Sequence, residues 1–316
     1  MGEFNFCKIT NEVFYTKDGT KSILKETNDY KVILLLDFLY YGEDRKKRIT
    51  FNLEDIITDW ELKPDNHKGK INDQFRSLLE YLKERGLILT DIDFNSIKPK
   101  EHLRIEVDLK IDNNFFCLPF EVVEKIFNIE EEVNKIILLA YWCYLESRRY
   151  KLSNKETEKR GKQATKSETC FLSYKRINED LGISESTIKK YNDILIEEKL
   201  LRIGNLGKIY NEEGKIKCAN NLYYTCKNEK DYYNIAPQQI NLGLKQQAYY
   251  YISKGYTLAE EKYNKIEEEY REKILEQDIE DVEELEEDIE YEEKLKEKSR
   301  STIEIRYRKD LPSGGF

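Results

Sequence analysis

Apolar positions in the first third of the chain recur with the spacing of helices and strands in turn. A nearly all-apolar run follows the capping residues Asn28 and Asp29 and stops at Gly42, which predicts a buried helix. Further along, apolar positions three and four residues apart predict an amphipathic helix that ends at Gly86. The predicted order is helix, strand, helix, helix, strand and strand, over residues 30–42, 48–51, 53–60, 71–86, 87–93 and 102–108.

The same order of predicted elements returns in the middle of the chain. The ends of the two third helices align as LKERGLI and LIEEKLL, which places Leu82 over Leu195 and Leu87 over Leu200, 113 residues apart. We therefore infer an internal duplication of one module, whose element order is that of a winged helix. The second copy covers residues 133–149, 170–173, 174–181, 184–199, 200–204 and 221–226.

These patterns predict a mainly α chain with small β wings, in the α+β class. Residues 1–110 are expected to form a first winged-helix domain with an extended N-terminal segment, and residues 111–235 a second, DNA-binding one. Residues 236–316 are expected to hold a connector, an acidic helix and a basic C-terminal tail. The thin apolar stripe of the acidic helix fits two interpretations, a solvated helix with no specific partner or a helix that docks on one.

Charge is segregated along the sequence. The net charge of -9 over 316 residues would by itself argue against a nucleic-acid partner. Residues 259–300 hold 19 acidic and 8 basic side chains, a net of -11, so the remainder of the chain carries +2. Residues 147–190 hold 12 basic and 6 acidic side chains, a net of +6, which makes this stretch a candidate phosphate-facing surface.

Features that would mark membranes, metals and enzymes are missing from the sequence. No apolar run approaches the roughly 18 residues of a membrane span, and no basic and then apolar leader begins the chain, so a cytoplasmic protein without a membrane partner is expected. The six cysteines form no CxxC pair and there are two histidines, which predicts reduced thiols and no zinc site. Without a phosphate loop, nucleophile elbow or His-x-His pair, we expect no cofactor and no enzyme, although scattered carboxylates leave a metal site open.

The sharpest motif is the stretch SYKRINEDLGISESTIKKYNDILIEEKLLRI. A tight turn at Gly182 joins two short predicted helices, and Ser184 is placed to cap the second, which is the arrangement of a helix-turn-helix. The N-terminal part of the second helix would enter a major groove and read base edges. The residues expected to contact DNA there are Ser184, Glu185, Ser186, Thr187, Lys189, Lys190 and Asn192.

Other predicted contacts are with the DNA backbone. The first helix of the motif offers Tyr174, Lys175 and Arg176, and the predicted wing offers Lys208 and Tyr210. A basic insert before Phe171 lacks apolar periodicity, so it is expected to be a loop. It is either merely solvated or orders on a phosphate or minor groove through residues that include Arg148, Arg149, Lys159 and Arg160.

Two winged helices in one chain, the second with the motif LGISESTIKKY, resemble the tandem winged-helix replication initiators of plasmids and phages. The resemblance covers residues 30–226, whereas the basic insert and the acidic tail have no counterpart in it. It implies that one winged helix binds repeated origin sites and that the other aids DNA contact or forms a homodimer.

Three functions remain open on this sequence. The first is a sequence-specific duplex-DNA-binding replication initiator that recruits a host replication protein, with the acidic tail as the candidate docking segment. The second is a winged-helix transcription regulator. The third is a protein-interaction adaptor in which neither module binds DNA, and it predicts no salt-sensitive DNA affinity.

Overall fold

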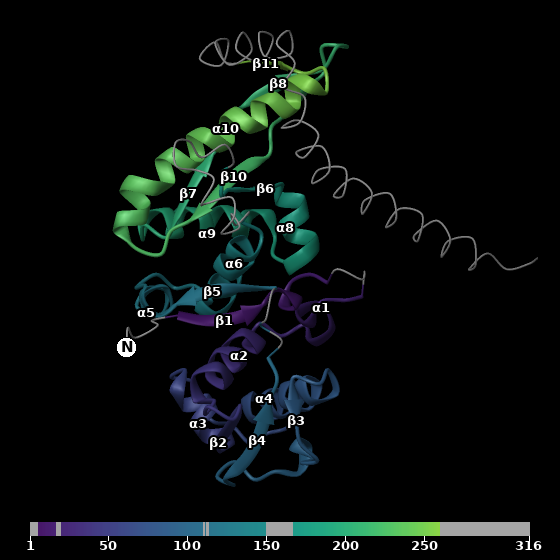
Figure 1. Ribbon diagram of the computed structural model, residues 1–316, viewed down its shortest axis with the longest axis vertical. Helices are drawn as coiled ribbons and strands as arrows, with labels where there is room; N and C mark the ends of the chain where they lie inside the picture. The colour runs from purple at the N-terminus through teal and green to yellow at the C-terminus, as the bar shows by residue number, and fades with distance from the viewer. Residues whose placement is uncertain (1–5, 17–19, 110, 112–113, 150–166, 260–316) are drawn as a thin grey trace, which may run out of the picture. The chain divides into compact units, whose positions relative to one another are not determined.

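The computed structural model describes residues 6–16, 20–109, 111, 114–149 and 167–259 (Figure 1). It consists of helices and small antiparallel sheets, which confirms the predicted α+β class. Two compact units divide the chain, one of residues 1–203 and 221–240 and the other of residues 204–220 and 241–316. The predicted acidic helix and basic tail lie outside the described residues. None of the described helices is both long and apolar enough to cross a bilayer.

The first predicted set of elements is present in the first unit. Asn52 caps the second helix through a capping box, because its side chain accepts from the Asp55 backbone N–H while the Asp55 carboxylate accepts from the N–H of Asn52. The three strands form one antiparallel sheet in the order β2-β4-β3. The elements are α2 (Lys31–Gly42), β2 (Arg48–Phe51), α3 (Leu53–Asp59), α4 (Ile71–Glu84), β3 (Ile88–Leu89) and β4 (Leu103–Val107), with a 3-10 turn at Phe94–Ser96.

The second set repeats this arrangement within the same unit. Its strands form a sheet in the order β6-β10-β7, so in both sets the last strand lies between the other two. Residues 150–166, the basic insert, lie outside the described part of the chain. The elements are α6 (Lys135–Ser147), β6 (Cys170–Leu172), α8 (Tyr174–Leu181), α9 (Glu185–Glu197), β7 (Leu201–Gly204) and β10 (Asn221–Thr225).

The third helices of the two sets end with the same hydrogen bond. The N–H of Leu87 donates to the carbonyl of Leu82 at 2.9 Å, and the N–H of Leu200 donates to the carbonyl of Leu195 at 2.8 Å. Gly86, just before Leu87, has a φ of 69°, and Lys199, just before Leu200, has a φ of 61°. The chain therefore leaves each of the two helices through a residue in the left-handed region. The 113-residue offset inferred from sequence therefore matches a shared backbone geometry.

The core of the second set is organised by α6. Three aromatic residues of this helix are fully buried, and each keeps a hydrogen-bond partner: Tyr141, Trp142 and Tyr144. The Tyr141 hydroxyl donates to Asn192 Oδ1 at 2.6 Å, and the Trp142 indole donates to the Leu200 carbonyl at 3.1 Å. The Tyr144 hydroxyl donates to Asp180 Oδ2 at 2.8 Å. One helix is thus bonded to α8, to α9 and to Leu200, the residue just before β7.

A strand pair that the sequence did not predict joins the N-terminal segment to the middle of the chain. β1 (Phe6–Thr10) pairs antiparallel with β5 (Phe115–Pro119), with Phe6 opposite Pro119. The predicted boundary after residue 110 therefore falls between two strands of one sheet. Two short elements follow β1, η1 (Asn11–Val13) and α1 (Ile23–Thr27), and α5 (Phe120–Phe127) follows β5.

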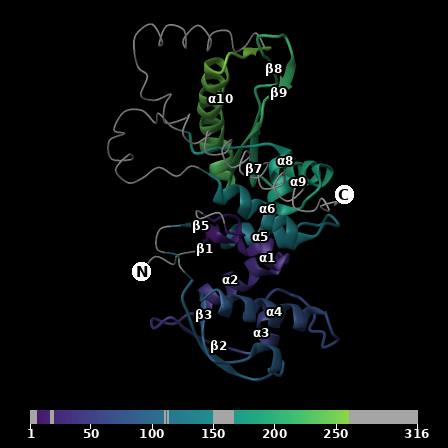
Figure 2. The same ribbon diagram turned by 90° about the vertical axis from the view of Figure 1, so that its right-hand side faces the viewer.

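The second unit is formed around a hairpin placed between β7 and β10. Its sheet has the order β11-β8-β9, and Ile209 and Leu258 from this sheet share a small core with Ala248 and Tyr251 of α10. Figure 2 shows the hairpin running beside α10. The elements are β8 (Lys208–Tyr210), β9 (Ile216–Cys218), α10 (Ala236–Ser253) and β11 (Thr257–Leu258), and a π-helix at Asp231–Ile235 precedes α10.

One prediction compares the two left-handed positions. A methyl group at Gly86 would meet nothing within 4 Å, so Gly86→Ala adds backbone strain alone and should cost about 1 kcal/mol of the free energy of unfolding. Lys199→Gly relieves the same strain and should stabilise by up to about 1 kcal/mol. Urea unfolding of both variants checks this, and a loss in Lys199→Gly would mean that the ammonium contact with the Tyr232 ring, at 5.6 Å, outweighs the strain.

A second prediction concerns Asp37 on α2, which is buried in the core of the first unit. Burial raises the pKa of this carboxyl from 3.8 to about 7, although a hydrogen bond with the Cys7 thiol lowers the pKa in part. Between these values the folded protein holds a proton that the unfolded chain releases, so stability falls as pH rises through that window.

Asp37→Asn keeps the shape of the side chain and removes its titration. We expect the variant to gain stability relative to the wild type between pH 4 and pH 8, by up to about 4 kcal/mol. Urea unfolding of both proteins across this range measures the difference. Parallel stability curves for the two proteins would contradict a buried, proton-binding Asp37.

Candidate nucleic-acid interface

The predicted helix-turn-helix has the local geometry expected of it. Gly182, with a φ of 72°, ends α8 in the left-handed region, and its N–H donates to the Asn178 carbonyl at 2.7 Å. The Asn178 amide then donates to the Ile183 carbonyl at 2.9 Å, which closes the turn. The Ser184 hydroxyl accepts from the Thr187 backbone N–H at 3.2 Å and so caps α9, as predicted.

An apolar face joins α8 to α9. Its six residues are all buried, so α9 turns one side to the rest of the module and the opposite side to solvent. These residues are Ile177, Leu181, Ile183, Ile188, Tyr191 and Leu195.

The solvent side of α9 carries two neighbouring cations. Lys189 and Lys190 are exposed, and Ser184, Glu185 and Ser186 are exposed at the N-terminal end of the helix, with Thr187 half-buried. The Lys189 ammonium lies 6.0 Å from the ring of Tyr174, the first residue of α8, where Lys175 is also exposed. The Lys190 ammonium donates to the Glu132 carbonyl at 3.3 Å. The two helices thus present one continuous polar and basic surface, termed here the α9 surface.

Asn192 does not belong to the α9 surface, and its prediction as a DNA contact is wrong. Its side chain is 3% exposed, accepts from the Tyr141 hydroxyl and donates to the Tyr174 hydroxyl at 3.4 Å. The reason is helical spacing, because Asn192 follows the buried Ile188 by four residues and precedes the buried Leu195 by three. A polar residue at that spacing could have been assigned to the interior from sequence.

Arg148 and Arg176 lie at a buried carboxylate that the sequence analysis missed. The Asp180 side chain, 3% exposed, pairs with Arg176 Nε at 2.8 Å and with an Arg148 guanidinium nitrogen at 3.1 Å. Arg148 caps the end of α6 and stacks at 4.4 Å on Tyr15, so its side chain is held by the fold and is not merely solvated. Burial raises the pKa of Asp180, but Arg176, Arg148 and Lys25 lower it by more, so the pKa lies below its usual value.

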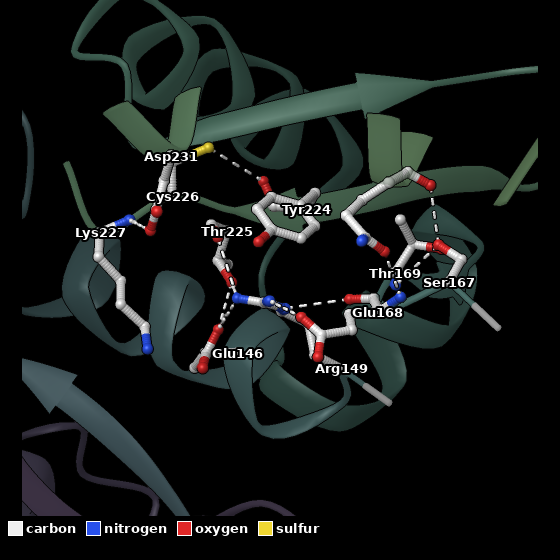
Figure 3. Close-up of polar contacts among 11 residues, drawn as sticks. Glu146, Arg149, Ser167, Glu168, Thr169, Tyr224, Thr225, Cys226, Lys227 and Asp231 are labelled. Atoms are coloured by element: carbon white, nitrogen blue, oxygen red, sulfur yellow. Dashed lines mark hydrogen bonds and ion pairs between the residues drawn. The ribbon is translucent and has the colours of Figure 1, made fainter. Parts of the chain in front are cut away.

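Arg149 is also removed from solvent, which overturns its prediction as a DNA contact. Figure 3 shows its polar contacts with Glu146, Glu168 and Thr225. Its side chain is 7% exposed and pairs with Glu146 at 2.9 Å and with Glu168 at 3.2 Å. It also donates to the carbonyls of Glu168 and Thr225, and its guanidinium stacks at 4.1 Å on Tyr224. Arg149 therefore joins the end of α6 to β10 and to the residues before β6. Lys159 and Arg160 lie outside the described residues.

The predicted wing residues belong to the second unit. Lys208 is exposed and Tyr210 half-buried on β8, which pairs with β9 on one side and with β11 on the other. The connection between β7 and β10 is thus a folded hairpin with its own core, in place of the simple wing loop that was expected.

The third helix of the first set differs from α9 in its charge. Two cations of this helix, Arg76 and Lys83, already have partners. Arg76 pairs with Asp73 at 2.9 Å and donates to the Ile97 carbonyl. Lys83 pairs with Glu80 and donates to the Ile92 carbonyl. A hollow of about 390 Å³ adjoins α4, lined by Thr27, Asp29, Gly69, Asp73, Gln74, Ser77, Leu78 and Tyr81. A phosphate would meet carboxylates at this surface, where the α9 surface offers lysines.

Across the described ranges, no group of three or more His, Cys, Asp or Glu side chains is arranged to hold a metal ion. The chain matches no protein-family model, and no curated protein and no solved structure is significantly similar to it.

The Arg149 cluster makes a testable prediction about stability. Arg149→Met removes the cation and leaves Glu146, 2% exposed, as an uncompensated buried charge, so we expect a loss of about 3–5 kcal/mol in the free energy of unfolding. Adding Glu146→Leu removes the stranded charge and should restore much of the loss. Urea unfolding measures the free energy of unfolding of the single and the double variant. A loss below about 1 kcal/mol in the single variant would contradict the prediction, because an ion pair on the surface contributes no more than that.

Proposed function

We propose that this chain is a sequence-specific duplex-DNA-binding protein and that the α9 surface contacts the DNA. The observation that carries the proposal is the exposed pair Lys189 and Lys190 in the N-terminal half of a helix whose other side is fully packed. A helix presented in this way fits the major groove, with the preceding helix lying across the backbone. Lys175 and Tyr174 at the start of α8 are placed for that second role.

We further propose that both sets of elements are winged-helix modules and that the chain is a replication initiator of a plasmid or phage. Support comes from the shared order of helices and strands and from the shared strand order, in which the last strand is central in both sheets. The matched left-handed residues Gly86 and Lys199 support a common origin of the two modules. A transcription regulator with the same architecture is the alternative, because DNA recognition alone does not choose the process.

A second candidate role applies to the first module. Arg76 and Lys83 are each paired with one carboxylate, Asp73 and Glu80, so neither pair carries an excess of positive charge. This favours a module that contacts protein over one that contacts DNA. We therefore assign DNA binding to the second module. A homodimer through the first module and a host replication protein at the acidic tail are the proposed protein partners.

The double variant Lys189→Ala/Lys190→Ala tests the α9 surface. Both side chains are exposed, so the fold should be kept, while the affinity for duplex DNA falls and the slope of log affinity against log salt decreases by about 2 if each lysine meets one phosphate. The matched control is Lys68→Ala/Lys70→Ala, two exposed lysines just before α4, which should leave affinity unchanged. Fluorescence anisotropy with a labelled duplex, and thermal melting of each variant, are the measurements.

The same variants separate the functional alternatives in a pull-down of fragments from the genome that encodes the chain. Enrichment of one locus that contains direct repeats, lost in the Lys189/Lys190 variant, would favour replication initiation, whereas enrichment at single promoter sites would favour transcription control. Unaltered binding by that variant would reject the α9 surface. A wild-type protein with no salt-sensitive DNA affinity would leave the adaptor function.

A further inference from the structure

Three cations from three separate elements converge on the carboxylate of Asp180. Lys25 of α1 donates to Oδ1 at 3.1 Å, while Arg148, at the end of α6, and Arg176 of α8 pair with Oδ2 at 3.1 Å and 2.8 Å. The Tyr144 hydroxyl also donates to Oδ2. With the pKa of Asp180 held below its usual value, the carboxyl is ionised at neutral pH. The four charged side chains then carry a formal charge of +2.

This excess of positive charge is accessible from solvent. The Asp180 side chain is 3% exposed, but Lys25 is 41%, Arg176 20% and Arg148 18% exposed. The carboxylate is thus buried, while the three cations that surround it remain partly exposed. Charges that are half removed from water are stabilised by a counter-charge, and guanidinium groups match the oxygen geometry of phosphate as well as that of carboxylate.

The cluster belongs in part to α8, the helix that precedes α9. Arg176 is in the first turn of α8, and its guanidinium reaches along the helix to Asp180 in the last turn. The first helix of a helix-turn-helix crosses the DNA backbone when the second enters the groove. Arg176 is therefore on the helix that would meet a phosphate flanking the contacted groove.

We propose that Lys25, Arg148 and Arg176 form a phosphate-binding site that holds a backbone phosphate of the bound DNA. The inference rests on the proposed DNA-binding function, and it adds a residue from outside the helix-turn-helix, Lys25, to the interface. Asp180 orients the three cations before DNA arrives, so that the site loses little side-chain freedom on binding. The N-terminal segment of the chain thereby contributes to DNA affinity through α1.

A purely structural role for the cluster predicts a different result. If the cations serve only to join α1, α6 and α8, then removing one lowers the melting temperature and leaves the salt dependence of DNA binding unchanged. A phosphate contact lowers the salt dependence, since each neutralised phosphate contributes about 0.9 to the slope of log affinity against log salt. Lys25 is the suitable position for the test because it is the most exposed of the three cations.

The experiment measures anisotropy of a labelled mixed-sequence duplex across a salt series for wild type, Lys25→Gln and Lys25→Arg. Mixed sequence suffices because phosphate contacts do not depend on bases. We expect Lys25→Gln to lower the slope by about 1 and the affinity near 0.1 M salt by up to about tenfold, while Lys25→Arg keeps both. The matched control is Lys47→Gln, an exposed lysine paired at 3.6 Å with one carboxylate, Asp108, which should change neither.

Each outcome decides between the two claims. A wild-type slope that persists in Lys25→Gln would overturn the phosphate site and leave the α9 surface standing. Equal slope losses in Lys25→Gln and Lys47→Gln would also overturn it, because they would reflect net charge alone. A wild-type protein that binds no duplex would reject the proposed function, and the phosphate site with it.

Discussion

Buried hydrogen bonds from one helix determine how the second module is arranged. Tyr141, Trp142 and Tyr144 lie close together on α6 and are bonded to α9, to Leu200 just before β7, and to α8, respectively. A buried hydroxyl or indole that loses its partner costs more than the bond itself contributes, so these bonds strongly disfavour other orientations of α8 and α9. The exposed lysines of α9 are held in place by groups on the opposite side of that helix.

The elements of both modules were predictable because their apolar spacing and caps are local signals. Asn52, Gly182 and Ser184 act within four residues of their partners, which is within the reach of a sequence pattern. The pairing of β1 with β5 was not predictable in this way, since nothing local to Phe6–Thr10 specifies a partner strand near residue 115. The folded hairpin between β7 and β10 was missed for the same reason, because its core depends on α10 and β11.

The site was predicted less well than the fold, and the errors have two causes. Arg148 and Arg149 were read as members of a solvated basic run, but each has carboxylate partners, Asp180 for one and Glu146 and Glu168 for the other. Charge density along a sequence does not show which cations are already paired in the fold. Asn192 was misplaced because its polarity was weighed above its helical position. Lys189 and Lys190 are exposed as expected.

The pairing of β1 with β5 affects how the chain folds during synthesis. The strand at residues 6–10 leaves the ribosome before its partner and lacks that neighbour until residue 119 has followed. Until then the apolar side chains Cys7 and Ile9, both fully covered in the native fold, have no strand to lie against. Closing so long a loop is slow and entropically costly. A fragment that stops after the first module would therefore present an unpaired strand edge, a known route to aggregation.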